Sequence, residues 1–177
     1  MKKLIISITV LIWTTALWSQ SEICTLLSSH AWRGFVTQEV DGWDSITTGH
    51  YMNIYFNNSN VQMDGSSYTI YGSREVSLPF EDEDGYITTY TCKTNFSGTF
   101  DSAAQTFDIK DYEFVYANDL PEDLYFMLDH FLVTIYVDES NNQFMLLKGH
   151  QLDENGYPLI GTDVFFTTDP NYSPWND

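Results

Sequence analysis

The sequence predicts an all-β fold, specifically a single antiparallel up-and-down barrel of about eight strands with a short helix between two of them. Apolar and polar side chains alternate along most segments, and these segments follow one another through short polar turns. Closing eight consecutive antiparallel strands into a barrel removes the exposed edges of the sheet. A β-sandwich is the alternative, because alternation does not distinguish a rolled sheet from two stacked sheets.

The clearest alternation runs through residues 85–116, which we interpret as two strands joined by a turn at 101–105. In the second strand the apolar side chains change from odd to even positions after Ile109, which predicts a β-bulge near Lys110 and Asp111. The first strand carries a row of apolar side chains on one face: Tyr86, Tyr90, Cys92, Phe96 and Phe100.

Outside this hairpin, residues 73–84 are expected to form a surface loop. A short helical turn is expected at 22–29, and a helix at 120–128, because Asp119 can cap it and Pro121 fits its first turn. Strands 131–137 and 144–147 are apolar on both faces, so this helix or a partner subunit is expected to cover them. The six further strands are expected at residues 31–39, 50–56, 61–71, 131–138, 143–151 and 157–166.

Residues 1–19 have the pattern of a secretory signal peptide. Lys2 and Lys3 precede an apolar run, and the small residues Ser19 and Ser21 offer cleavage after residue 19 or after residue 21. The residue before Cys24 is Ile23 rather than the small residue of a lipid-anchoring signal, so we expect a soluble exported chain, periplasmic or extracellular. The rest of the chain then forms one barrel domain at 22–168 and a polar tail at 169–177.

The two cysteines of the exported chain, Cys24 and Cys92, are expected to form a disulfide, because export leads to an oxidising compartment. Such a bond would hold the N-terminal segment against the central hairpin. Two buried free thiols are the alternative, since Cys92 falls on the apolar face of its strand.

The chain is strongly acidic, with 25 Asp and Glu against 7 Lys and Arg and a formal net charge of −18. Nucleic acid and anionic membrane surfaces are therefore not expected as partners, because binding either one relies on clustered Lys and Arg. Insertion into a membrane is not expected either, because the N-terminal apolar run is too short to be a good membrane span. The acidic runs at 81–84 and 153–155 are candidates for calcium, but solvated turns are the favoured explanation, and the EF-hand spacing is missing.

The sequence carries no motif for nucleophilic catalysis or for a phosphate-binding loop, and its four histidines do not cluster as zinc ligands. We therefore expect no metal, no cofactor and no enzymatic activity. A small hydrolase that uses the acidic loops is a weaker alternative.

Three short segments resemble a loose group of secreted lipocalin-like proteins of the Bacteroidota. They are Trp32-Arg33-Gly34 ahead of Thr37-Gln38, Gly65-Ser66-Ser67-Tyr68, and Phe96-Ser97-Gly98-Thr99-Phe100. The resemblance implies a β-barrel and export from the cell. It implies no catalytic residue.

The abundant aromatic residues carry the functional hypotheses. The favoured one is a secreted, non-catalytic barrel that binds a small apolar or amphipathic ligand, since exposed rings can line a barrel mouth or stack on a sugar. An interaction module that binds a protein partner or a glycan, or forms a homodimer, through strands 131–147 is the alternative. The residues expected to contact the ligand are Trp43, Tyr51, Tyr55, Tyr86 and Tyr90.

Overall fold

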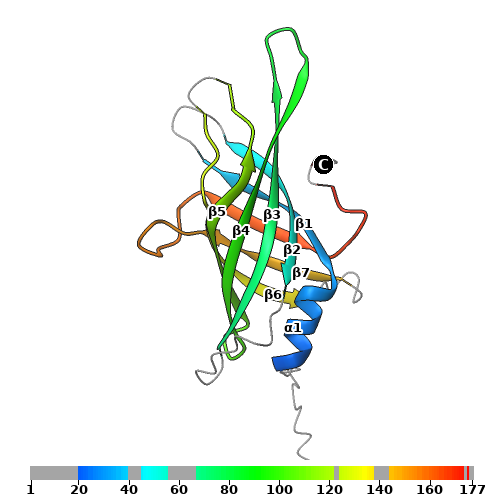
Figure 1. Cartoon of the computed structure of the whole chain (residues 1–177), viewed down its shortest axis with the longest axis vertical. Helices are drawn as coiled ribbons and strands as arrows, with labels where there is room; N and C mark the ends of the chain where they lie inside the picture. The colour runs from blue at the N-terminus through cyan, green and yellow to red at the C-terminus, as the bar shows by residue number, and fades with distance from the viewer. Residues whose placement is uncertain are drawn as a thin grey trace, which may run out of the picture.

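The structure is a computed structural model, described here for residues 20–39, 45–55, 67–121, 124–137, 144–173 and 175. The predicted signal peptide and Trp43 lie outside these residues. Within them the chain forms a closed antiparallel barrel in which each strand pairs with the next and β8 pairs back with β1 (Figure 1). The predicted barrel is confirmed. Its elements are α1 (Gln20–Ser29), β1 (Ala31–Gln38), β2 (Ile46–Tyr55), β3 (Ser67–Glu81), β4 (Ile87–Asp101), β5 (Thr106–Ala117), β6 (His130–Val137), β7 (Met145–Gln151) and β8 (Thr162–Thr167).

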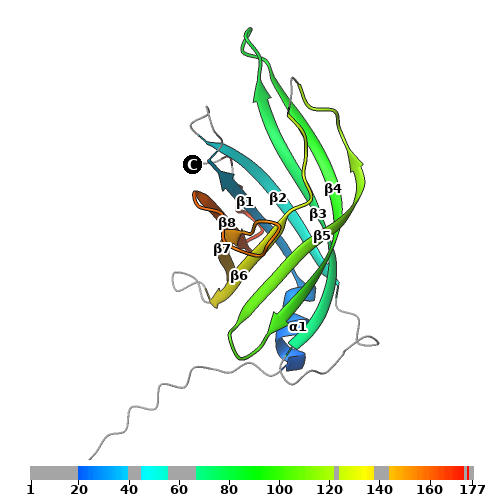
Figure 2. The same ribbon diagram turned by 90° about the vertical axis from the view of Figure 1, so that its left-hand side faces the viewer.

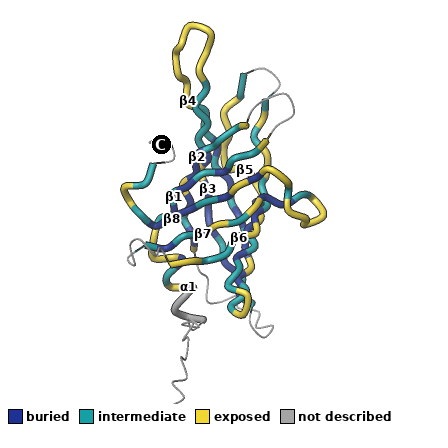
Figure 3. Tube along the Cα trace, turned by 180° about the vertical axis from the view of Figure 1, so that it is seen from behind, coloured by how far each residue is buried: buried dark blue, intermediate teal, exposed yellow. Residues whose placement is uncertain are grey.

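The β3–β4 hairpin is longer than the sequence predicted. The expected surface loop at 73–84 is wrong for its first nine residues, because Ser73–Glu81 continue β3 and pair with Asn95–Ile87 of β4. The sequence did not indicate a strand here, because charged residues and proline are uncommon in strand interiors. This segment contains Arg74, Glu75 and Pro79. The far end of this hairpin projects beyond the barrel and is exposed (Figure 3).

Two turns of the chain have the same geometry and sequences that differ at one residue. Residues 82–86 read DEDGY and residues 153–157 read DENGY. In both, the aspartate N–H donates to the tyrosine carbonyl, the glycine N–H donates back to the aspartate carbonyl, and the glycine φ is 83°. Only glycine adopts this φ without strain. The last strand was predicted to begin at residue 157, which belongs to the second turn. In the structure β8 starts at Thr162.

The bulge predicted in the second strand of the central hairpin is confirmed. Phe96 pairs with Asp111 and Asn95 pairs with Glu113, so Tyr112 is the extra residue of β5. A second register shift lies two residues further along the pair. Beyond the bulge, β5 still pairs with β4 but no longer with β6, whose partners on β5 are residues 106–110.

The connection from β5 to β6 is irregular where a helix was predicted. Residues 118–121 and 124–129 have no helical structure, so the helix at 120–128 is wrong for the described residues. We call residues 124–129 the strap; the connection descends from the upper end of β5 to the start of β6 (Figure 2). A single helix of two turns is marginal in water, and the end of the strap instead makes a sheet-like contact, in which the Asp111 N–H donates to the Asp129 carbonyl at 2.9 Å.

Helix α1 lies at the end of the barrel opposite the projecting β3–β4 hairpin (Figure 1). The short helix predicted at 22–29 is confirmed. Leu27 is fully buried, and the Trp32 indole N–H donates to the Leu27 carbonyl at 3.0 Å. The side chains above α1 form a solid apolar core. Its fully buried members include Met52, Ile70, Phe96, Phe100, Phe107, Ile109, Phe131, Leu147 and Phe166.

The predicted disulfide is not formed, and both cysteines are buried free thiols, which was the alternative. Cys24 lies beside Tyr68 near the start of β3. Cys92 lies on β4 and pairs with Val76, which is further along β3. Eight strand residues separate the two sites by about 27 Å, and a disulfide spans at most about 7 Å between Cα atoms. Burial raises the pKa of Cys24 to about 11 and that of Cys92 to about 12, which keeps both thiols protonated.

We predict that Leu27→Ala lowers the free energy of unfolding by about 2–5 kcal/mol, because it leaves a cavity where α1 meets the core. Urea unfolding followed by circular dichroism measures the change. The control is Thr25→Ala on the exposed side of α1, which we expect to change stability by less than about 0.5 kcal/mol. Equal effects of the two substitutions would show that α1 does not plug the barrel.

Candidate functional site

A layer of polar side chains crosses the interior of the barrel above the apolar core. The strand register places it there, because inward-facing residues of β3 change from Tyr68 and Ile70 to Arg74, and then to Val76 towards the strap end. Its members come from five elements: His50 of β2, Arg74 of β3, Asp111 of β5, Asp129 at the end of the strap and Gln151 of β7.

Arg74 is the centre of this layer. Its side chain is fully buried, and its Nη2 forms ion pairs with Asp111 Oδ2 and, at 2.6 Å, with Asp129 Oδ2. The guanidinium also lies over the Phe131 ring, 4.9 Å from the ring centroid. A charge removed from water in this way requires compensating charges and hydrogen bonds, and here two carboxylates supply them.

His50 connects the layer to the wall of the barrel. Its Nδ1 lies 2.8 Å from Arg74 Nη1, and its Nε2 lies 2.7 Å from Thr48 Oγ1. Because a guanidinium can only donate, Nδ1 must accept, so the neutral ring carries its proton on Nε2 and donates it to Thr48. Burial, with Arg74 as a second cause, holds the pKa of His50 well below its usual 6.5.

Asp129 fixes the end of the strap in the polar layer. Its N–H donates to Asp111 Oδ2 at 3.1 Å, and its Oδ1 accepts from Gln151 Nε2 at 2.8 Å. Burial raises the pKa of the Asp129 carboxyl, an effect that Arg74 opposes and Asp111 reinforces. Its side chain keeps 17% of its surface exposed, whereas those of Arg74 and Asp111 keep none.

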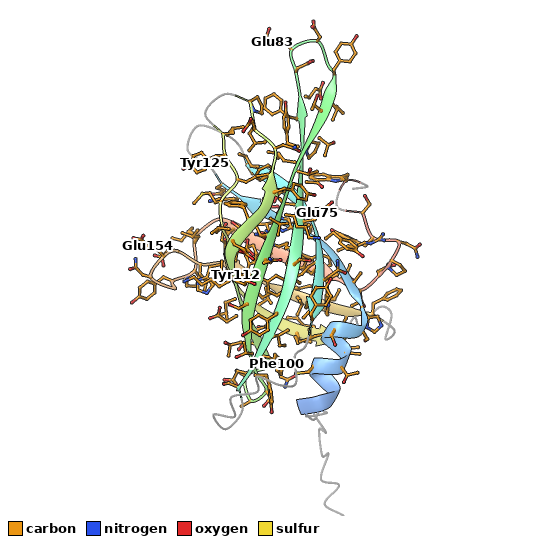
Figure 4. The ribbon with its side chains drawn as sticks, in the orientation of Figure 1. Glu75, Glu83, Phe100, Tyr112, Tyr125 and Glu154 are labelled. Atoms are coloured by element: carbon orange, nitrogen blue, oxygen red, sulfur yellow. The ribbon has the colours of Figure 1, made fainter. Side chains whose placement is uncertain are left out.

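Two cavities meet at this end of the barrel. The first, of about 120 Å³, lies between the strap and the barrel wall, with Gln38, Thr48, Asp129 and Gln151 as its polar lining. Its apolar lining includes Val36, Ile46, Val76, Leu78, Leu124 and Met127. The second, of about 540 Å³, is lined by Asp129, Gln151 and Met127 as well, together with Asp111 and the turn at 153–154. Figure 4 shows Tyr125 of the strap far from Phe100, at the end of the molecule opposite α1.

The structure does not bring together the four predicted ligand-contacting residues that it describes; Trp43, the fifth, lies outside the described residues. Tyr51 and Tyr55 are exposed on β2, and the Tyr51 ring lies 5.9 Å from the Arg33 guanidinium carbon. Tyr86 is 72% exposed at the tip of the projecting hairpin. Tyr90 is half-buried, and it alone of these four pairs with a residue of the cavity lining, Leu78.

Sequence reasoning missed every member of the polar layer as a site residue. The available signal was a polar side chain at an inward-facing position, and Asp111 and Gln151 both alternate with buried apolar neighbours. Polar groups at core positions are informative because they are rarely buried without a partner or a role.

The acidic turns considered for calcium use their first carboxylates within the turn. Asp153 Oδ1 accepts from the N–H groups of Asn155 and Tyr157, which lowers the pKa of Asp153, and Asp82 accepts in the same way from Asp84 and Tyr86. Among the residues that the structure describes, no group of three or more His, Cys, Asp or Glu is placed to hold a metal ion. Within the same residues, no helix has the length and apolar character needed to cross a membrane.

We predict that His50 makes the protein lose stability as the pH falls from about 6.5 to 5. In this range the unfolded chain binds a proton at His50 and the folded chain does not, so each pH unit costs up to about 1.4 kcal/mol. Urea unfolding at several pH values measures the slope. In His50→Gln, whose amide can still pair with Arg74 and Thr48, this part of the slope should disappear.

The matched control is His30→Gln, since His30 is exposed and lies outside the barrel interior. We expect this variant to keep the slope of the unchanged protein. A slope that survives in His50→Gln would contradict the neutral, buried assignment of His50.

Comparison with protein-family models, with curated proteins and with solved structures gave no match for this chain. The resemblance to secreted lipocalin-like proteins of the Bacteroidota therefore stays a prediction. The candidate site is assigned from its geometry alone.

Proposed function

We propose that the protein is a non-catalytic, exported barrel that binds a small apolar or amphipathic ligand in the first cavity. One observation carries the proposal: the barrel is filled and plugged at the α1 end, whereas the strap end holds a cavity with apolar walls and polar groups at its base. Most small-molecule sites combine these two features, because apolar walls provide affinity and a few polar groups fix orientation.

The size of the first cavity limits the ligand. At about 120 Å³ it is similar to the engineered apolar cavity of about 150 Å³ that binds benzene. The strap as it stands therefore leaves room for about one ring or a short chain. A long fatty acyl chain would have to displace the strap.

The ionisable groups of the polar layer pair with one another, which supports a binding role over a catalytic one. Arg74, Asp111 and Asp129 are held in mutual ion pairs, and the His50 ring nitrogens are both occupied. General acid–base catalysis needs such a group within reach of the substrate. Of the three ion-paired groups, only Asp129 keeps exposed side-chain surface.

We predict that the protein binds neutral ring compounds such as toluene and indole, and that Val76→Phe weakens their binding at least about tenfold by filling the first cavity. Ligand-observed NMR measures the affinity, and circular dichroism verifies that the variant is folded. The control is Val137→Phe at the exposed end of β6, which should leave binding unchanged. If the unchanged protein binds neither these two compounds nor a ring compound of similar size that carries a polar group, the proposal fails.

The outer face of β6 and β7 supports a second candidate function, an interface with a second copy or another protein. Leu132 and Tyr136 are 39% and 48% exposed there, and Tyr136 pairs with Leu146 of the neighbouring strand. The helix that was expected to cover this face is not formed. An exposed apolar group of this kind is typical of interaction surfaces.

For this candidate we predict a concentration-dependent dimer that the double substitution Leu132→Asp and Tyr136→Asp converts to monomer. Size-exclusion chromatography with light scattering measures the mass. The control is Ile87→Asp, an equally apolar and more exposed position on the projecting hairpin. A folded monomer at all concentrations would argue against self-association through this face.

A further inference from the structure

The charges at the base of the first cavity are unbalanced. Arg74 contributes one positive charge, whereas Asp111 and Asp129 contribute two carboxylates, and His50 is held neutral by its contacts. The adjoining second cavity is lined by Lys110 and His130 and also by Asp153 and Glu154, and His130 already lies 2.7 Å from Asp108. The described surroundings therefore leave a negative excess at the base of the cavity.

Two buried oxygen atoms in the layer also lack hydrogen-bond partners among the described residues. They are Gln151 Oε1 and Asp111 Oδ1, on residues that are only 7% and 4% exposed. Gln151 lines both cavities, and its Nε2 is already committed to Asp129. An orphaned buried acceptor is costly, so this site is suited to a group that donates hydrogen bonds.

A ligand carboxylate fits the same place poorly. The two terminal nitrogens of Arg74 are occupied by His50, Asp111 and Asp129, and only its Nε is without a partner. Among the described residues, no Lys lines the first cavity. A second anion beside two carboxylates would be repelled in a site removed from water.

We propose that the ligand of the first cavity is a small organic cation, an ammonium group on an apolar body of about one ring. Asp129 provides the charge partner, and the amide oxygen of Gln151 accepts a hydrogen bond from the ammonium. The apolar body lies against Val76, Leu78 and the strap, where Phe126 adds an aromatic ring to the lining. This inference rests on the proposed binding function and narrows it to one chemical class.

The test compares four ligands of similar size on the unchanged protein at pH 7: benzylamine, benzyl alcohol, toluene and benzoate. Isothermal titration calorimetry or ligand-observed NMR gives each affinity. We expect benzylamine to bind at least about tenfold more tightly than toluene and benzyl alcohol, and benzoate not to bind. This comparison needs no variant, so it stands whether or not a substitution affects folding.

Two variants then locate the ammonium. Asp129→Asn and Gln151→Met should each reduce the advantage of benzylamine over toluene at least about threefold, with toluene affinity nearly unchanged. Asp108→Asn is the control, because that carboxylate is half exposed and pairs with His130 instead. It should leave the advantage of benzylamine intact.

The outcomes separate the inference from the function on which it rests. If toluene binds and benzylamine binds no more tightly, the cation assignment is wrong and the binding function stands. If benzoate binds best, the assignment is also overturned. If none of the four ligands binds, the proposed function itself fails.

Discussion

The ion pairs of Arg74 with Asp111 and Asp129 are the interaction on which the architecture of the strap end depends. A guanidinium inside the barrel cannot be left without a counterion, and its two partners come from β5 and from the strap. Asp111 is the last residue of β5 before the bulge, and Asp129 is the last residue before β6. One buried charge therefore ties the end of the irregular connection, at Asp129, to β5 beside the bulge.

This arrangement divides the barrel into two parts with different properties. Towards α1 the interior is apolar and completely filled, and such packing stabilises a fold efficiently. In the polar layer, replacing a buried ion pair by apolar residues is often neutral or even stabilising, whereas removing one partner costs about 3–5 kcal/mol. Stability alone thus gives little reason for this layer, and its place at the base of a cavity gives a functional one.

The sequence predicted those features that depend on local patterns. Alternation located most strands, the change of apolar parity after Ile109 located the bulge, and the short N-terminal helix was expected from its apolar positions. The polar layer depends instead on contacts between distant residues, since Arg74 lies 37 and 55 positions from its two carboxylate partners. No periodic signal connects residues at such separations. The exposed aromatics were the more visible feature, and the described ones among them do not gather in one place.

On the proposed function, a ligand enters beside the strap and requires no opening of the barrel wall. In the described part of the strap, the backbone is tied to β5 at Asp129, while Tyr125 and Met127 are more than half exposed. Segments with few buried contacts open at a lower free-energy cost than a packed core. Because Asp129 anchors the strap and also lines both cavities, a group that binds this carboxylate acts on the very contact that holds the strap in place. If the proposed ligand binds this carboxylate, its binding and the position of the strap are coupled through Asp129.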